Sequence, residues 1–595
     1  MKKLVFLSFL FLSFFSYSQK PADKRLAGLD TFVVRVLKSW NAPGVSIAVI
    51  EKNKVVYTGG FGYRDYEKKL PVTENSLFAI GSCTKAFTAA MLGMLEKEGK
   101  LSIDKPVRDY LPELKFQNEY ANNHVTLRDM MSHRTGLPRH DLSWYGSTAS
   151  RKELLERIQY LKPTAELRER YQYNNFMFMA QGVAIEKLTG KSWEENLKER
   201  IFKPLGMNKS VVTTGEMEVS TDHSRAYSLK NDSLIIAIPF RNIDAIGPAG
   251  SINSSAKEMA NWLITWINGG KFNNKEIIPA GYVNQAIMVQ TATGGGVPGK
   301  ENADIHFGGY GLGWGMSSYR GHYRVEHGGG IDGFITTTSF YPSDSIGIFV
   351  VSNQSGPSSS IRNFIADRML KLEPRNWIDY LLATEKRARD AAKAVPNTDS
   401  LNRKKGTRPS VALADYAGTY SNPGYGSMIV SFENDQLGAR LNAFDLKLEH
   451  FHFDQFRAVL REESPGFQPL KVSFHLDGKG NPEKLTVPLQ FGVKDIEFKK
   501  EIKAIAVQKT ELEKYAGDYE FAPGSLAKFY IKNNNTLYAF VEGQPEYELV
   551  AVKKDEFNFK TLSGYSVKFE ANEKGEIAAV NFIQPNGIFK ATRKK

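Results

Sequence analysis

The spacing of apolar and polar residues predicts strands at both ends of the first part of the chain and helices between them. The predicted elements are a helix at 29–40, strands at 45–50 and 54–59, mostly helices from 85 to 266, strands at 324–327, 334–340 and 346–352, and a helix at 359–372. Strands from both ends can pair with one another while the helices pack beside them. The pattern therefore predicts an α+β domain with one antiparallel sheet and a helical region.

The pattern changes beyond this domain. A segment rich in Lys, Arg and Ala at 374–409 is followed by short alternating runs that are separated by Gly, Asn and Asp turns. The sequence LADYAGTY at 413–420 is echoed by LEKYAGDY at 512–519, and each copy begins a module long enough for a small β-barrel or sandwich. We expect the α+β domain at 19–373, a basic linker at 374–409, and two small all-β barrel-like domains at 410–505 and 506–595.

The first 18 residues have the pattern of a signal peptide. Lys2 and Lys3 precede an apolar run at 4–15, and a small-x-small site at 16–18 precedes Gln19. The apolar run is too short to span a bilayer comfortably, and no later segment is long enough. The sequence thus predicts an exported protein, periplasmic or extracellular, with no integral membrane segment in the mature chain.

Composition and charge narrow the functional class. Apolar residues make up 42% of the chain and aromatic residues 12%, which is enough for packed cores. The formal net charge of +13 is concentrated at 386–405, where no nucleic-acid motif accompanies it. We interpret this charge as a solvated linker and expect no nucleic-acid partner. The single cysteine, Cys83, excludes an internal disulfide.

Candidate chemistry begins at Ser82 and Lys85. A short apolar run ends at Gly81, and a helical pattern follows as far as Glu98. Ser82 is therefore expected at a helix N-terminus with Lys85 one turn along the same face, where a hydroxyl and an amine can share a proton. Cys83 is about 100° around this helix from Ser82, so we interpret it as a small buried hydrophobe.

Two further stretches carry residues of related chemistry. Tyr173 and Asn175 precede a helical run, where a phenol can relay a proton and a carboxamide can bind both Lys85 and a substrate carbonyl. The alternative is a helix N-cap by Asn174 or Asn175. His327 precedes three glycines at a predicted strand end, where backbone can approach a substrate closely. The alternative there is a glycine turn with a surface histidine.

A metal site is considered at His450, His452 and Asp454. Three ligands spaced two apart on one strand give poor tetrahedral geometry, because same-side residues lie about 7 Å apart. A polar face of a barrel strand is the preferred interpretation, and we expect neither a metal nor an organic cofactor.

Taken in order, the motifs Ser-x-x-Lys at 82–85, Tyr-x-Asn at 173–175 and His-x-Gly at 327–329 resemble the serine β-lactamase-like family, in its class C β-lactamase, D-aminopeptidase and esterase branch. Three further segments resemble the same branch of this family: VTLRDMMSHRTGLP at 125–138, GPAGS at 247–251 and YGLGW at 310–314. The resemblance implies a β-lactamase/transpeptidase-like fold in which the site lies between the helical region and the sheet. Small barrels after this domain are similar to those of D-aminopeptidases.

The resemblance also implies roles for individual residues. Ser82 would be the nucleophile, Lys85 would take its proton, and Tyr173 would act as general base and then acid. The other implied roles are substrate binding by Asn175, His327 and Gly329, and an oxyanion hole formed by the backbone N–H groups of Ser82 and Gly330.

The sequence departs from this family at His327, where the β-lactamases carry the lysine of Lys-Thr-Gly. A neutral imidazole binds a carboxylate more weakly than lysine does, which disfavours strong β-lactam hydrolysis. The leading hypothesis is an exported serine hydrolase that cleaves amide or ester bonds in small peptides or cell-wall-type substrates through an acyl-enzyme. The alternatives are a β-lactamase, or a penicillin-binding or sensor protein that acylates with little turnover.

Overall fold

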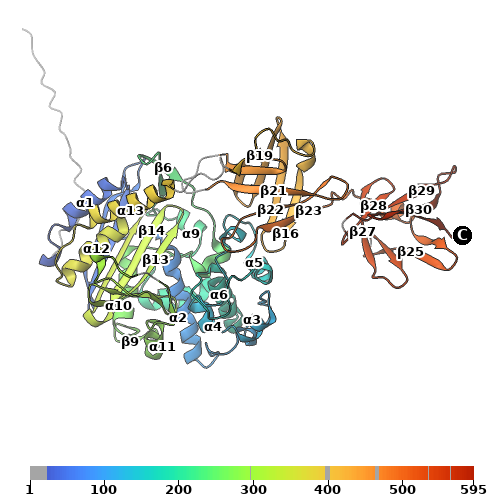
Figure 1. Cartoon of the computed structure of the whole chain (residues 1–595). Coiled ribbons are helices and arrows are strands. Elements are labelled where there is room, and N and C mark those ends of the chain that lie inside the picture. The colour runs from blue at the N-terminus through green and yellow to red at the C-terminus, as the bar shows by residue number, and fades with distance from the viewer. Residues whose placement is uncertain are drawn as a thin grey trace, which may run out of the picture. The chain divides into compact units, whose positions relative to one another are not determined.

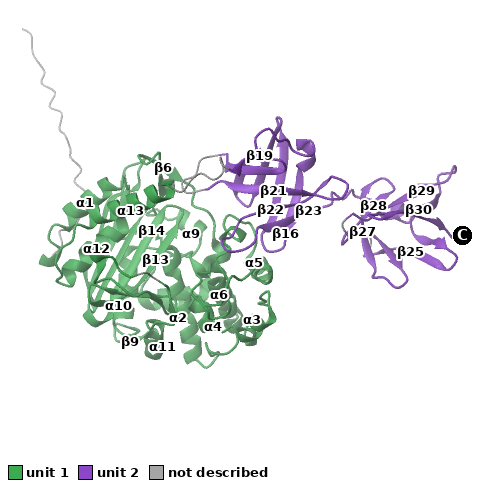
Figure 2. Cartoon of the chain, viewed as in Figure 1, with its two compact units in different colours: residues 1–398 green, residues 399–595 purple. Residues whose placement is uncertain are grey.

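The computed structural model describes residues 23–294, 297–394, 402–461, 468–533, 535–562 and 564–594. The chain divides into two compact units, 1–398 and 399–595 (Figure 2). The predicted signal peptide at 1–18 lies outside the described residues. Among the helices that are described, none combines the length and apolar character needed to cross a membrane.

In the described part of unit 1, nine strands form one antiparallel sheet. Their order is β10 (Thr291–Ala292), β11 (Gly309–Tyr310), β12 (Gly315–Tyr319), β13 (His322–Ile331), β14 (Phe334–Tyr341), β15 (Ile346–Ser352), β1 (Gly44–Glu51), β2 (Lys54–Asp65) and β3 (Leu70–Pro71). Strands β1 and β15 pair in the centre, with Val49 opposite Ile348. The predicted sheet assembled from both ends of the domain is confirmed.

Strand β2 is longer than the pattern predicts. We expected it to end at Gly59, but it continues through the glycines to Asp65. A Cβ at Gly60 would lie 2.4 Å from the carbonyl oxygen of Val72, so the missing side chain lets a neighbouring backbone approach the strand. Here glycine marks close packing within the sheet and not the end of a strand.

Helices cover both faces of the sheet (Figure 1). One face packs against α1 (Leu29–Ser39) and α12 (Pro357–Met369), and the other against α10 (Ala256–Ile267) and the turn that precedes α2 (Thr84–Lys97). Helix α13 (Trp377–Ala394) falls within the expected linker, yet its residues Trp377 and Ile378 are buried in the same core as α1 and α12. The first turn of this segment therefore helps to hold unit 1 together.

The remaining helices form the helical region beside the sheet. They are α3 (Glu119–His124), α4 (Leu127–Met131), α5 (Arg151–Arg157), α6 (Asn175–Thr189), α7 (Trp193–Leu197), α8 (Lys203–Leu205), α9 (Thr214–Glu218) and α11 (Ala280–Ala286). Helix α6 begins where the side chain of Asn174 accepts a hydrogen bond from the backbone N–H of Met177, and it ends at Gly190 in the left-handed conformation. The N-cap alternative for Asn174 is thus correct, and the cap fixes the direction of the chain at Tyr173 and Asn175.

Unit 2 contains two closed barrels, each with eight strands among the described residues. The first consists of β16 (Gly418–Asn422), β17 (Gly426–Glu433), β18 (Gln436–Leu441), β19 (Phe444–His452), β20 (Gln455–Leu460), β21 (Leu470–Leu476), β22 (Pro482–Val487) and β23 (Ile496–Lys500). The second consists of β24 (Gly517–Ala522), β25 (Ser525–Lys532), β26 (Thr536–Val541), β27 (Tyr547–Lys553), β28 (Glu556–Phe559), β29 (Ser566–Ala571), β30 (Ile577–Gln584) and β31 (Gly587–Arg593). The predicted pair of small β-barrels is confirmed.

The repeated sequence makes the same contacts in both barrels. The hydroxyl of Tyr420 donates to the carbonyl oxygen of Tyr416 at 2.9 Å, and Tyr519 donates to Tyr515 at 3.0 Å. The hydroxyl of the first tyrosine of each pair donates in turn to an aspartate in a distant hairpin turn. Those bonds are Tyr416 to Asp454 and Tyr515 to Asp555. Asp454 therefore lies in a turn and not on the strand with His450 and His452. Its hydrogen bond with Tyr416 connects this turn to the start of the barrel.

Candidate active site

Ser82 lies in a short 3-10 turn, Gly81–Cys83, that leads directly into α2. Gly81 has a φ of 51°, and a Cβ on it would lie 2.9 Å from the backbone nitrogen of Gly330. Only glycine combines this left-handed conformation with such a close approach. The turn thus brings Ser82, which is partly exposed, against β13 of the sheet.

Lys85 is fully buried and makes three contacts through its Nζ atom. Nζ lies 3.1 Å from Ser82 Oγ, 2.7 Å from Asn175 Oδ1 and 2.8 Å from the carbonyl oxygen of Ala249. Burial lowers the pKa of Lys85 well below its usual value, and the nearby Arg139 cation lowers it further. A neutral amine has two hydrogens, which the two carbonyl oxygens accept, so its lone pair is left for the Ser82 hydroxyl.

Tyr173 stands beside both of these groups. Its ring centroid lies 4.8 Å from Lys85 Nζ, and its hydroxyl lies near Ser82. A neighbouring ammonium would make the phenol lose its proton more readily. Instead, burial raises the pKa of Tyr173, so the phenol is protonated at neutral pH. The arrangement gives Tyr173 a proton to donate and Lys85 a lone pair to accept one.

His327 is on β13, which lies next to the turn that contains Ser82. Its Nδ1 lies 2.6 Å from the carbonyl oxygen of Gly328, which can only accept, so this nitrogen carries the hydrogen. Its Nε2 then accepts from the hydroxyl of Tyr310 at 2.8 Å. Burial, together with the nearby Lys85, lowers the pKa of His327 to about 4. The imidazole is therefore neutral at physiological pH, and the protein occupies both its nitrogens.

The glycines after His327 allow β13 to approach the serine turn. A Cβ at Gly329 would lie 1.9 Å from the carbonyl oxygen of Ile80, a distance that no side chain tolerates. Gly330 is exposed, and its backbone nitrogen is close to Gly81. The structure thus brings together the backbone of Ser82 and of Gly330, the two groups that sequence analysis assigned to an oxyanion hole.

Sequence reasoning missed the residues that hold Tyr173 and Asn175 in place. His133 Nδ1 accepts the backbone N–H of Asn174 at 3.1 Å, and its ring centroid lies 4.3 Å from that of Tyr173. Asn175 Nδ2 donates to Asp141 Oδ1 at 3.0 Å, which fixes the Asn175 amide so that its oxygen points to Lys85. His133 lies within the segment that carried the resemblance, but nothing in the sequence connects Asp141 to this site.

Cys83 faces the interior as expected. It is 1% exposed, its thiol donates to the carbonyl oxygen of His327 at 3.2 Å, and burial raises its pKa to about 12. A thiol with so high a pKa is a poor nucleophile, so the partly exposed hydroxyl of Ser82 is the better candidate.

An antiparallel sheet flanked by helices, with a serine next to a buried lysine at a helix N-terminus, defines the class of β-lactamase/transpeptidase-like folds. Residues 29–369 match the family model described as Beta-lactamase, and the chain belongs to this family. Residues 402–500 match a domain of unknown function, DUF3471. The first barrel thus has a family but no assigned activity.

Named relatives support the same class. The chain is 29% identical over 441 residues to unguisins hydrolase ungD' of Aspergillus campestris (strain IBT 28561), covering 70% of this chain and 79% of the relative. It is 23% identical over 329 residues to protein flp of Staphylococcus aureus (strain NCTC 8325 / PS 47), covering 55% of this chain and 62% of that protein. The octameric penicillin-binding protein homologue from Pyrococcus abyssi shares the fold, with a TM-score of 0.53 and 23% identity over 80% of this chain and 100% of that one. These findings place the protein in the β-lactamase-fold hydrolase family.

Proposed function

We propose that this protein is an exported serine hydrolase that cleaves amide or ester bonds in small peptides or cell-wall-type substrates through an acyl-enzyme on Ser82. The observation that carries the proposal is the 3.1 Å contact between Ser82 Oγ and the Nζ of Lys85, a buried lysine whose pKa is lowered. A relative named as a hydrolase of unguisins supports this activity. The pattern of residues 1–18 supports export.

Acylation begins when the lone pair of Lys85 Nζ takes the proton of the Ser82 hydroxyl. Oγ then attacks the substrate carbonyl, and the N–H groups of Ser82 and Gly330 stabilise the oxyanion that forms. Tyr173 donates its phenolic proton to the leaving nitrogen or oxygen as the scissile bond breaks, and the proton held by Lys85 replaces it. The products of this step are an ester on Ser82 and a neutral leaving group.

Deacylation uses the same groups in reverse. A water molecule attacks the ester carbonyl while its proton passes to Tyr173, which gives its own proton to the lone pair of Lys85. A proton then returns from this pair to Ser82 Oγ as the acid product leaves. Asn175 orients the substrate, because the second hydrogen of its amide is left for a carbonyl after the first has bonded Asp141.

His327 shapes the substrate preference by its neutrality. A substrate carboxylate at this wall would find no positive charge and no unoccupied nitrogen on the imidazole. This favours amide and ester substrates that need no cation on the β13 wall. We therefore expect slow nitrocefin hydrolysis by the purified protein, with a kcat/KM at least about a hundredfold below that for a short acyl ester. Faster turnover of nitrocefin than of esters and peptides would establish the β-lactamase alternative instead.

Covalent labelling tests the acyl-enzyme directly. A fluorophosphonate probe is expected to add one equivalent to Ser82, as located by peptide mass spectrometry, and Ser82→Ala should abolish the adduct. Cys83→Ser is the matched control, because it changes the adjacent nucleophilic atom and should keep the label on Ser82. If the Ser82→Ala variant were labelled as fully as the unsubstituted protein, the proposed acyl-enzyme on Ser82 would be wrong.

Turnover separates the hydrolase from a protein that acylates and then stalls. Steady hydrolysis of D- or L-aminoacyl p-nitroanilides, or of p-nitrophenyl esters, is the expected result. A burst of one equivalent without steady turnover for every substrate would identify a sensor or penicillin-binding function.

A further inference from the structure

A cavity lies on the face of the sheet opposite Ser82. Its volume is about 340 Å³, which is within the range of small-molecule sites. The walls come from β12, β13, α12, α13 and the segment around η8 (Lys300–Asn302). Side chains along β13 alternate between the faces of the sheet. Arg324 and Glu326 therefore lie on the α12 side, whereas His327 lies on the Ser82 side.

Two arginines in this cavity share one carboxylate. Arg324 Nη2 lies 2.8 Å from Glu326 Oε1, and Arg362 Nη1 lies 2.5 Å from Glu326 Oε2. The two guanidinium side chains are only 9% and 12% exposed. Burial raises the pKa of Glu326, but the two arginines outweigh it and hold the pKa below its usual value. The trio therefore carries one positive charge in excess.

Neighbouring charges do not remove this excess, because they cancel among themselves. Arg320 pairs with Asp367 at 2.9 Å, and Arg375 pairs with Asp304 at 2.8 Å. An unbalanced guanidinium that is so largely buried is costly unless an anion or water compensates it.

Each of the two arginines also has a terminal nitrogen that is available to donate a hydrogen bond to a ligand. Arg324 Nε donates to Ser317 Oγ, and Arg362 Nε donates to Asn363 Oδ1. Nη1 of Arg324 and Nη2 of Arg362 have no hydrogen-bond partner within the described residues, and both side chains line the cavity. Planar N–H groups of this kind match the oxygens of a carboxylate.

The rest of the wall is aromatic and apolar. Tyr319 and Trp377 stack with ring centroids 6.3 Å apart, and Tyr380 meets Trp377 edge-on at 5.7 Å. Ile305 and Leu381 complete this side. A ligand that fits must therefore combine a small anionic head with an apolar or aromatic body.

We infer that this cavity is a binding site for a small organic carboxylate with an aryl or short apolar body, separate from the Ser82 site. The carboxylate pairs with Arg324 and Arg362, and its body lies against Ile305, Tyr380 and Leu381, which are partly exposed in the lining. Because the cavity and Ser82 lie on opposite faces of the sheet, the two sites can be occupied together.

Isothermal titration of the full chain with 3-phenylpropionate tests the inference. The neutral 3-phenylpropanamide is the matched ligand, and protein whose Ser82 carries the fluorophosphonate label excludes binding at the proposed active site. We expect the carboxylate to bind labelled and unlabelled protein equally, at least tenfold tighter than the amide. Equal binding of carboxylate and amide, loss of binding in labelled protein, or no saturable binding would overturn the inference.

Two variants that are expected to change the affinity for 3-phenylpropionate in opposite directions provide a second test. Arg362→Gln is expected to weaken 3-phenylpropionate binding at least tenfold, whereas Glu326→Gln should strengthen it because it leaves both arginines unbalanced. Arg387→Gln removes the same charge from an exposed position of α13 and should change the affinity less than twofold. If Arg362→Gln does not fold, Glu326→Gln still decides, since unchanged or weaker binding there contradicts the inference.

Discussion

Replacing Lys85 by methionine is expected to slow the acylation of Ser82 by about a thousandfold, a loss typical of a missing general base. Methionine keeps the apolar stem of the side chain but removes the lone pair that faces Ser82 Oγ. Arginine is not expected to rescue the reaction. Its guanidinium stays protonated at any accessible pH, so it cannot take the serine proton.

The rate of fluorophosphonate labelling measures this effect, with circular dichroism to show that each variant is folded. The pH profile of the unsubstituted protein gives a second check. Lys85 acts as a base only when deprotonated, so the labelling rate should rise with pH through the lowered pKa of Lys85 and level off well below the ordinary lysine pKa. A Lys85→Arg variant that labels at the original rate would contradict the role we assign to this residue.

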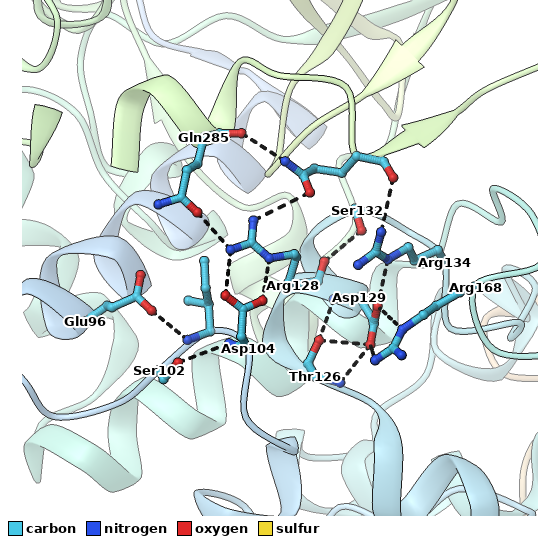
Figure 3. Close-up of polar contacts among 12 residues, drawn as sticks. Glu96, Ser102, Asp104, Thr126, Arg128, Asp129, Ser132, Arg134, Arg168 and Gln285 are labelled. Carbon is cyan, nitrogen blue, oxygen red and sulfur yellow. Dashed lines mark hydrogen bonds and ion pairs between the residues drawn. The ribbon is translucent and has the colours of Figure 1, made fainter. Parts of the chain in front are cut away.

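Replacing Asp129 by alanine is expected to lower the free energy of unfolding of unit 1 by about 2–3 kcal/mol, because hydrogen bonds to a buried charged group are lost while the two arginines stay partly exposed. Asp129 is fully buried at the start of α4 and binds Arg134 Nε at 2.6 Å and Arg168 Nη2 at 2.9 Å (Figure 3). It also accepts the backbone N–H of Thr126 at 3.0 Å. Without the carboxylate, the capping N–H of Thr126 loses its partner, and Arg134 and Arg168 lose their ion pair and keep only bonds to the carbonyl oxygens of Gln290 and His124.

Thermal and urea unfolding of the full chain measure this loss as a shift of the unit 1 transition. Asp104→Ala is the control, because this carboxylate pairs with Arg128 at 2.6 Å but is 61% exposed, and we expect a cost below about 1 kcal/mol. An Asp129→Ala protein as stable as Asp104→Ala would contradict the prediction.

Acid should weaken the same network. Burial raises the pKa of Asp129, but Arg168, the Thr126 N–H and Arg134 outweigh it, so the folded-state pKa is below the usual value. A carboxylate whose pKa is lower in the folded than in the unfolded state stabilises the fold. This stabilisation is fully present above the unfolded pKa of about 4 and is lost as the pH falls through the folded pKa. The Asp129→Ala variant should lack this part of the acid dependence.

Sequence patterns predicted much of the architecture because the relevant forces are local or periodic. Alternation identified the central strands, and the repeat at 413–420 and 512–519 predicted two β modules that fold alike. Failures occurred where a tertiary contact reversed a local preference. Glycines that break isolated strands are tolerated in β2 because the backbone at Val72 packs against them. Helix α13 adds to the core through Trp377 although most of its sequence has the composition of a linker.

By itself, the sequence determined that Ser82 and Lys85 lie one turn apart at the start of a helix, since that spacing depends only on helical geometry. Only the tertiary structure decided the protonation state of the site. The low pKa of Lys85 needs the burial that distant segments supply, and the neutrality of His327 needs burial and its bond to Tyr310. Such properties follow from desolvation and from contacts between segments far apart in the chain, and no spacing within one motif encodes them.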